Sequence, residues 1–191
     1  MRIAPSTTVR EPAVSIPGDA SRWNGESLSS LVRHIVDHHH AYTRTSLGIL
    51  HDLSRKVVAA HGEKHPEVAE IGRLVEALDA DLRPHLMKEE LVLFPYIERL
   101  DAKMRAGYRP VPPSFGAIDN PVRVMMIEHD RVGELLRELR ARTAGYQAPA
   151  GACTTWRAFY AELRALEHDL LEHIHLESNV LFPRSLDAQG R

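Results

Sequence analysis

Two stretches of the chain place a histidine and a glutamate in the same frame. HLMKEELVLFP, which begins at His85, and HIHLESNVLFP, which begins at His173, both read His-x-x-x-Glu-x-x-x-Leu-Phe-Pro. Residues four apart on a helix share one face, with Cβ atoms about 5–6 Å apart. The glutamate of each copy, Glu89 or Glu177, therefore points the same way as its histidine. Imidazole and carboxylate groups without a thiolate suit iron, manganese or zinc, so the repeated spacing predicts two halves of one metal site.

The repeat extends upstream to a lone histidine in each half of the chain. His40 lies in DHHHAYTR and His129 lies in MIEHDRVG, and each precedes its His-x-x-x-Glu motif by almost the same number of residues. A comparison of the two copies also distinguishes between two adjacent acids of the first copy, Glu89 and Glu90. Glu90 is replaced by Ser178 in the second copy, whereas Glu89 keeps a counterpart. The sequence therefore predicts four histidines and two glutamates as metal ligands.

The apolar neighbours of these six residues place them on helix faces that point into the core. Burying two carboxylates there without partners costs roughly several kcal/mol each, and a pair of divalent cations offsets that cost. In the predicted site each ion takes two histidines while both glutamates bridge, which leaves open positions for oxo, water, dioxygen or nitric oxide. The predicted ligands are His40, His85, Glu89, His129, His173 and Glu177.

Helical periodicity dominates the chain, and strand signals are scarce. Helices are expected over residues 26–60, 66–93, 122–142 and 155–180. Each Leu-Phe-Pro is interpreted as apolar packing followed by a helix stop. Four long helices with mostly short links predict an all-α, up-down four-helix bundle built from two repeated helical hairpins. Residues 1–25 are expected to form a flexible N-terminal segment, and residues 26–191 the bundle domain.

The overall composition argues against several other classes of protein. The formal net charge is -2 and the pI about 6.6, which gives no electrostatic reason to expect nucleic acid or an anionic membrane as partner. No apolar run approaches the roughly 20 residues that span a bilayer, and the N-terminus has no apolar stretch typical of a secretory signal. The single cysteine, Cys153, excludes an internal disulfide and a cysteine-only metal site. We therefore expect a cytoplasmic protein.

Several other residues receive predictions from their positions on the helices. His38 and His175 are expected to face away from the site, because only one residue of a consecutive pair or triple points straight at the centre. Met125 and Met126 are expected to lie in the core. Glu128, which precedes a predicted ligand, has two competing interpretations: it orients a ligand or lines a route inward, or it is a surface acid.

The motifs together resemble a known family. HLMKEELVLFP, MIEHD with the following GELL, CTTW at residues 153–156, and HIHLESNVLFPR resemble the repair-of-iron-centres proteins, in motif order from about Leu28 to Arg184. These are hemerythrin-like di-iron proteins with an HHE cation-binding domain. The resemblance implies a four-helix bundle around a non-haem pair of iron ions, bridged by oxo or hydroxo and carboxylate groups. Its ligands fall on the same six residues, and Arg44 and Glu128 match family positions near the centre.

The resemblance also implies a function. It predicts repair or protection of iron–sulfur clusters under nitrosative and oxidative stress, by iron donation, by nitric oxide chemistry, or by both. The implied partners are damaged iron–sulfur proteins or cluster assembly proteins, with nitric oxide or dioxygen as small-molecule ligands. Zinc or manganese are possible substitutes for iron.

Three alternatives stay open at the level of sequence. The first is a hemerythrin-like protein that binds or senses dioxygen or nitric oxide. The second is an enzyme that reduces nitric oxide or nitrite at the two irons, and the third is a metal-free interaction bundle. The chain also departs from the family in two ways: it shows no N-terminal domain with a cysteine pair, and His39 stands where an aromatic residue is common.

Overall fold

The chain forms four helical rods. The computed structural model describes residues 20–108 and 116–190, and within these ranges it contains helices and no strand. After a short 3₁₀ helix, η1, the first rod comprises α1, η2 and α2, the second α3, η3 and α4, the third α5 alone, and the fourth α6, η4 and α7. Their bounds are η1 Ala20–Asn24, α1 Leu28–His34, η2 Ile35–His40, α2 Ala41–His61, α3 Glu67–Lys88, η3 Glu89–Leu93, α4 Phe94–Arg105, α5 Asp119–Arg142, α6 Thr154–Leu176, η4 Glu177–Leu181 and α7 Phe182–Gln189.

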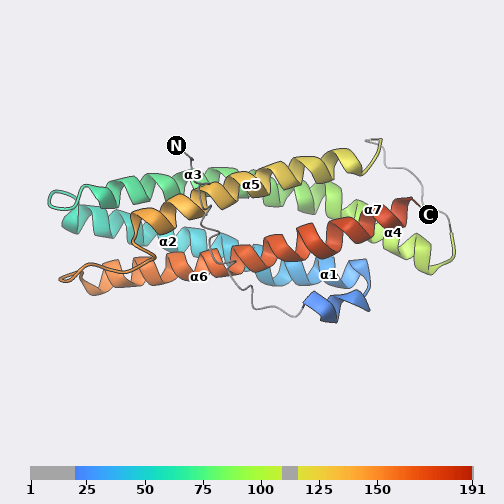
Figure 1. Ribbon diagram of the computed structural model, residues 1–191, viewed down its shortest axis with the longest axis horizontal. Helices are drawn as coiled ribbons and strands as arrows, with labels where there is room; N and C mark the ends of the chain where they lie inside the picture. The colour runs from blue at the N-terminus through green and yellow to red at the C-terminus, as the bar shows by residue number, and fades with distance from the viewer. Residues whose placement is uncertain (1–19, 109–115, 191) are drawn as a thin grey trace, which may run out of the picture.

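The rods lie side by side along the long axis of the molecule (Figure 1). The connections from α2 to α3 and from α5 to α6 lie at the same end, and α4 and α7 lie at the other. Helix α2 packs against α3 and α6, and α3 packs against α5. The predicted all-α, up-down four-helix bundle is therefore confirmed.

Two of the predicted helix ends are wrong. The second rod does not end near residue 93 but continues through η3 into α4, and the fourth continues past residue 180 through η4 into α7. Both η3 and η4 are π-helical turns, in which the hydrogen bonds span one residue more than in an α-helix. Pro95 and Pro183 are each the second residue of the α-helix that follows. In that first turn a missing N–H group costs little, so Leu-Phe-Pro marks a change of winding instead of a stop.

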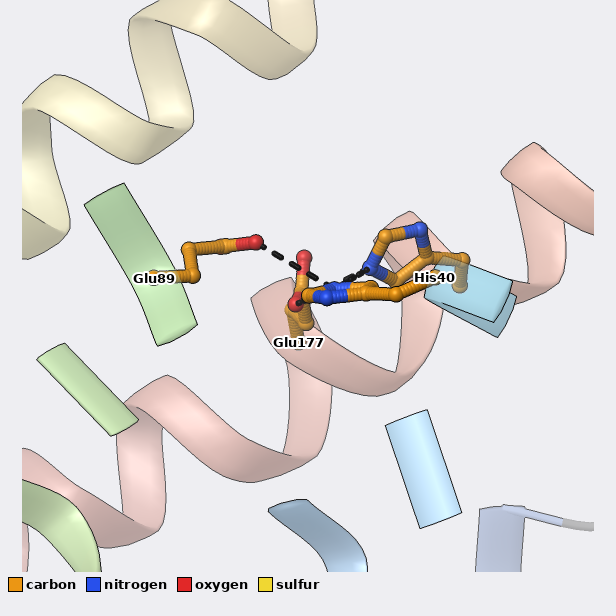
Figure 2. A group of neighbouring side chains, drawn as sticks. His40, Glu89 and Glu177 are labelled. Atoms are coloured by element: carbon orange, nitrogen blue, oxygen red, sulfur yellow. Dashed lines mark hydrogen bonds and ion pairs between the residues drawn. The ribbon is translucent and has the colours of Figure 1, made fainter. Parts of the chain in front are cut away.

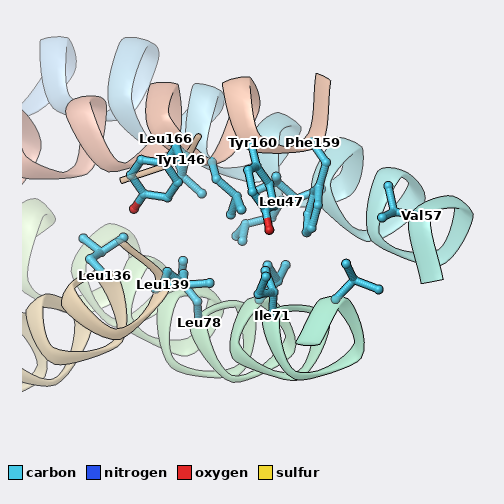
Figure 3. Packing of buried hydrophobic residues seen from close by; sticks show 14 of the residues in the cluster. Leu47, Val57, Ile71, Leu78, Leu136, Leu139, Tyr146, Phe159, Tyr160 and Leu166 are labelled. Carbon is cyan, nitrogen blue, oxygen red and sulfur yellow. The ribbon is translucent and has the colours of Figure 1, made fainter. Parts of the chain in front are cut away.

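Two apolar clusters flank the middle of the bundle. Leu47, Ile71, Leu78 and Phe159 belong to the first, which fills the space between the rods toward the α2–α3 end (Figure 3). The second is at the opposite end and is built around buried side chains such as Leu31, Ile35, Phe94, Leu181 and Phe182. Along every rod the predicted ligands fall between the two clusters, so the site has apolar walls on both sides.

One predicted core residue is outside the core. Met125 is 3% exposed and packs in the second cluster, as predicted, but Met126 is 38% exposed. Consecutive residues of a helix differ by about 100° in direction, so the two methionines cannot both face the core.

The described fold begins earlier than the expected boundary at residue 25. Trp23 is buried, and Arg184 of α7 donates a hydrogen bond of 2.7 Å to its carbonyl oxygen. Ser27 then caps α1 by accepting from the backbone N–H of Ser30. Residues 1–19, the remainder of the segment expected to be flexible, lie outside the described residues.

Candidate metal centre

All six predicted ligands converge in the middle of the bundle. His40 is the last residue of η2, Glu89 and Glu177 are the first residues of η3 and η4, and the other three histidines come from α3, α5 and α6. Each of the six side chains is buried. Figure 2 shows His40 pointing toward the two glutamates, which approach from different rods.

The six side chains form two groups that share both glutamates. The groups are His40, Glu89, His173 and Glu177, and His85, Glu89, His129 and Glu177, and within each the ligand atoms lie within 4.8 Å of one another. The Nε2 atoms of His40 and His173 are 3.1 Å apart, and those of His85 and His129 are 3.2 Å apart. Nitrogen atoms that face each other in pairs, with carboxylate oxygens alongside, are an arrangement that suits a shared cation.

The two buried carboxylates lie among imidazole nitrogens. Glu89 and Glu177 are fully buried, and an oxygen of Glu177 lies 3.0 Å from Nε2 of His173 and another 3.1 Å from Nε2 of His129. An oxygen of Glu89 lies 3.4 Å from Nε2 of His85. Among the described residues, however, none of the four oxygens has a partner aligned for a hydrogen bond. The residues present therefore fit a pair of cations.

The pKa shifts of the two glutamates also favour a pair of cations at this site. Burial raises the pKa of Glu89 well above its ordinary value, and the negative charge of Glu177 adds to that shift. Burial also opposes the ionisation of Glu177, but His173 and His129 outweigh it and hold its pKa well below the ordinary value. Glu89 and Glu177 have ligand atoms within 4.8 Å of each other. Two buried carboxylates this close cannot both stay ionised unless positive charge lies nearby. Cations supply that charge directly.

A comparison with protein families decides the identity of the bundle. The model of the hemerythrin HHE cation-binding domain matches residues 31–185. The chain belongs to this family. It is also 35% identical over 173 residues to iron–sulfur cluster repair proteins YtfE from Yersinia pseudotuberculosis serotype IB (strain PB1/+), Yersinia pestis (strain Pestoides F) and Yersinia pestis bv. Antiqua (strain Angola). Each match covers 91% of this chain and 72% of the relative.

The resemblance predicted from the motifs is therefore confirmed. None of the described helices of this hemerythrin-family chain is both long enough and apolar enough to cross a membrane.

π-Helical turns position three of the six candidate ligands of this hemerythrin-family chain. Such turns insert one residue into the helical winding and occur often at functional sites. In η2 the wider winding buries two neighbouring histidines, since His39 is 4% exposed and His40 is 0% exposed. His40 points at the centre, as expected. His39 lies against the ring of His173, with the two rings nearly parallel and their centroids 5.6 Å apart.

The outer nitrogen of His40 is held by an acid that the sequence reasoning set aside. Nδ1 of His40 is 2.7 Å from an oxygen of Glu90, and Arg44 donates to the same oxygen over 2.6 Å. This places Arg44 near the centre through Glu90. The repeat contained a signal for this role, because Ser178 occupies the same frame in the second copy and contacts Nδ1 of His129 at 3.0 Å.

Glu128 lies beside the site and supports another of its histidines. One of its oxygens is 2.9 Å from Nδ1 of His85, and the other accepts from the ammonium group of Lys88. Of the two interpretations of Glu128, this position favours an acid that orients a ligand. Burial raises the pKa of Glu128, but Lys88 and His85 outweigh that effect and lower it.

His38 and His175 lie away from the centre, as expected from the helical geometry. His38 is exposed, and His175 makes a 3.0 Å hydrogen bond with Asn179 on the outside of its rod. We expect His175→Ala to leave the metal content per chain unchanged and to alter the free energy of unfolding by no more than about 0.5 kcal/mol. Metal analysis and denaturant unfolding check this, and a loss of metal would contradict the assignment of helix faces.

Proposed function

We propose that this protein is a non-haem di-iron protein that takes part in the repair or protection of iron–sulfur clusters under nitrosative and oxidative stress. The observation that carries the proposal is the pair of buried four-residue groups that share Glu89 and Glu177. The family membership and the relatives named as cluster repair proteins support it. The proposed partners are damaged iron–sulfur proteins or cluster assembly proteins, and the proposed location is the cytoplasm.

The proposed ligand set assigns two imidazoles to each ion and both carboxylates to the pair. His40 and His173 would hold one iron, and His85 and His129 the other. Iron bound there would supply one-electron chemistry and open coordination positions for dioxygen or nitric oxide. Zinc and manganese accept the same donors and are the expected competitors during loading.

The surrounding residues keep the proposed ligands dry and oriented. The ring of Phe94 stacks on His40 with a centroid distance of 5.6 Å, and the ring of Phe182 stacks on His129 at 6.0 Å. These aromatic rings belong to the apolar cluster that walls one side of the site. Glu90 holds the orientation of His40 from outside, which fixes the nitrogen that faces the centre.

Glu128 lies between a surface pocket and the candidate ligand His85. A surface pocket is lined by Ala80, Asp81, Pro84, Lys88, Glu128 and Arg131. The carboxylate of Glu128 forms part of the wall of this pocket and contacts His85 behind it. We propose that small molecules reach the site at this point, where a rotation of the Glu128 side chain exposes His85.

A reconstitution assay tests the proposed function. An iron–sulfur enzyme inactivated by peroxide or nitric oxide is incubated anaerobically with the iron-loaded protein, a thiol reductant and sulfide, and its activity is followed. Recovery is expected with the loaded protein and not with a Glu177→Ala variant treated in the same way. Recovery with iron salts but none with the loaded protein would contradict iron donation. A stable, reversible oxygenated spectrum without cluster recovery would favour the carrier alternative.

A further inference from the structure

The two halves of the site are related by the sequence repeat, and the repeat can be followed into the residues around it. His40 and His129 are the lone histidines of the two halves. Each is held at Nδ1 by the residue that follows the shared glutamate of its own hairpin, Glu90 at 2.7 Å in one half and Ser178 at 3.0 Å in the other. For these two histidines the halves are equivalent.

The histidines of the His-x-x-x-Glu motifs are not equivalent. Nδ1 of His85 has a carboxylate partner 2.9 Å away in Glu128, the residue before His129. The corresponding residue before the other lone histidine is His39. It stacks flat on His173, and its own Nδ1 points to Asp169 at 3.0 Å.

Within residues 20–108 and 116–190, His173 therefore has no outer support. Its side chain is 1% exposed, and its Nδ1 has no hydrogen-bond partner among the side chains and backbone groups of the described residues. Stacking against the ring of His39 fixes the plane of the His173 imidazole, but it provides no hydrogen-bond acceptor for an N–H group at Nδ1. Partners at the outer nitrogen fix the tautomer and raise the basicity of a ligand histidine, and their loss typically lowers metal affinity by about 10- to 100-fold.

We infer that the two ions are held unequally: the ion between His40 and His173 binds last and leaves first. The ion between His85 and His129 has both of its histidines anchored from outside, by Glu128 and by Ser178. The inference rests on the proposed di-iron function and adds to it. In a donor of this design, one ion would leave while the other would keep the buried glutamates neutralised and the bundle folded.

Metal titration tests the inference without any activity assay. Cobalt(II) or iron(II) is titrated anaerobically into the metal-free protein in competition with a chromophoric chelator. Two binding steps are expected, separated by about 10- to 100-fold in affinity. His173→Ala should abolish the weaker step and keep the tighter one, and His129→Ala should do the reverse. A single step for both ions, or loss of the tighter step in His173→Ala, overturns the inference.

Variants of the supporting residues separate orientation from simple packing. Glu128→Leu removes the acceptor behind His85 and should weaken the tighter step by about 10- to 100-fold, whereas Glu128→Gln keeps an acceptor and should restore most of it. His39→Gln places an amide oxygen at the position that corresponds to Glu128 and should tighten the weaker step. If neither support variant moves its own step, the inference is wrong. Failure to bind any metal would instead overturn the di-iron proposal itself.

Discussion

Glu89→Gln is expected to stabilise the metal-free protein and to destabilise the metal-loaded one. Burial and the neighbouring Glu177 raise the pKa of Glu89 well above its ordinary value, so folding without metal favours the protonated form of this acid and opposes its ionisation. Between the ordinary Glu pKa of about 4.3 and the raised pKa of the folded protein, each pH unit adds about 1.4 kcal/mol to the cost of folding. Glutamine has nearly the same shape and carries no such cost.

The effect of Glu89→Gln on the stability of the protein reverses its sign once metal is present. Glutamine removes one of the two proposed bridging carboxylates, so loading should fall from two ions to one or fewer per chain. Ions that bind only the folded state stabilise it, each by about 4 kcal/mol at a thousand times its Kd. The loaded variant should therefore unfold more easily than the loaded parent protein.

Denaturant unfolding of both forms measures this reversal, with metal content determined in parallel. The stabilisation of the metal-free variant should grow as the pH rises above about 4.3 and vanish at lower pH, because the acid is then protonated in both the folded and the unfolded chain. Glu63→Gln, at an exposed position, is the matched control and should show neither effect. A metal-free Glu89→Gln protein that is less stable than its parent at pH 7 would contradict the expected charge state of the pair.

The sequence predicted the fold because its information was periodic and repeated. The two His-x-x-x-Glu motifs and the two lone histidines fixed which helix faces meet, and the structure brings together all six side chains that this reasoning selected. The choice of Glu89 over Glu90 followed from comparing the copies. A single copy would have left two acids in competition.

The local winding could not be predicted from the same pattern. Helical periodicity assumes 3.6 residues per turn, but η2, η3 and η4 wind more widely. The interpretation of Leu-Phe-Pro as a helix stop was therefore wrong, because the rod continues at this point. The burial of His39 beside His40 was not expected either. Both features depend on tertiary contacts across the site. Such contacts leave no periodic trace in the chain.

Metal binding is expected to release protons. The apparent affinity for metal should therefore rise steeply with pH. Burial alone would lower the pKa of His40, but the adjacent Glu177 and Glu89 outweigh it and raise the pKa to about 10. For His85, burial dominates and lowers the pKa to about 4. A metal ion binds only the neutral imidazole. At pH 7–9 an incoming ion must therefore displace a proton from His40, whereas His85 is already neutral.

The size and sign of the pH dependence of metal affinity follow from this difference between the pKa values of His40 and His85. For each proton displaced, the apparent affinity rises about tenfold per pH unit while the pH stays below the pKa of the group that loses it. Calorimetric titration in buffers of different ionisation enthalpy counts the protons, and His40→Ala should release one fewer than the parent protein. Equal affinities at pH 7 and pH 9 with no proton release would contradict the prediction. Because His40 belongs to the half-site in which His173 lacks an outer partner, acidification should loosen the less firmly held ion first.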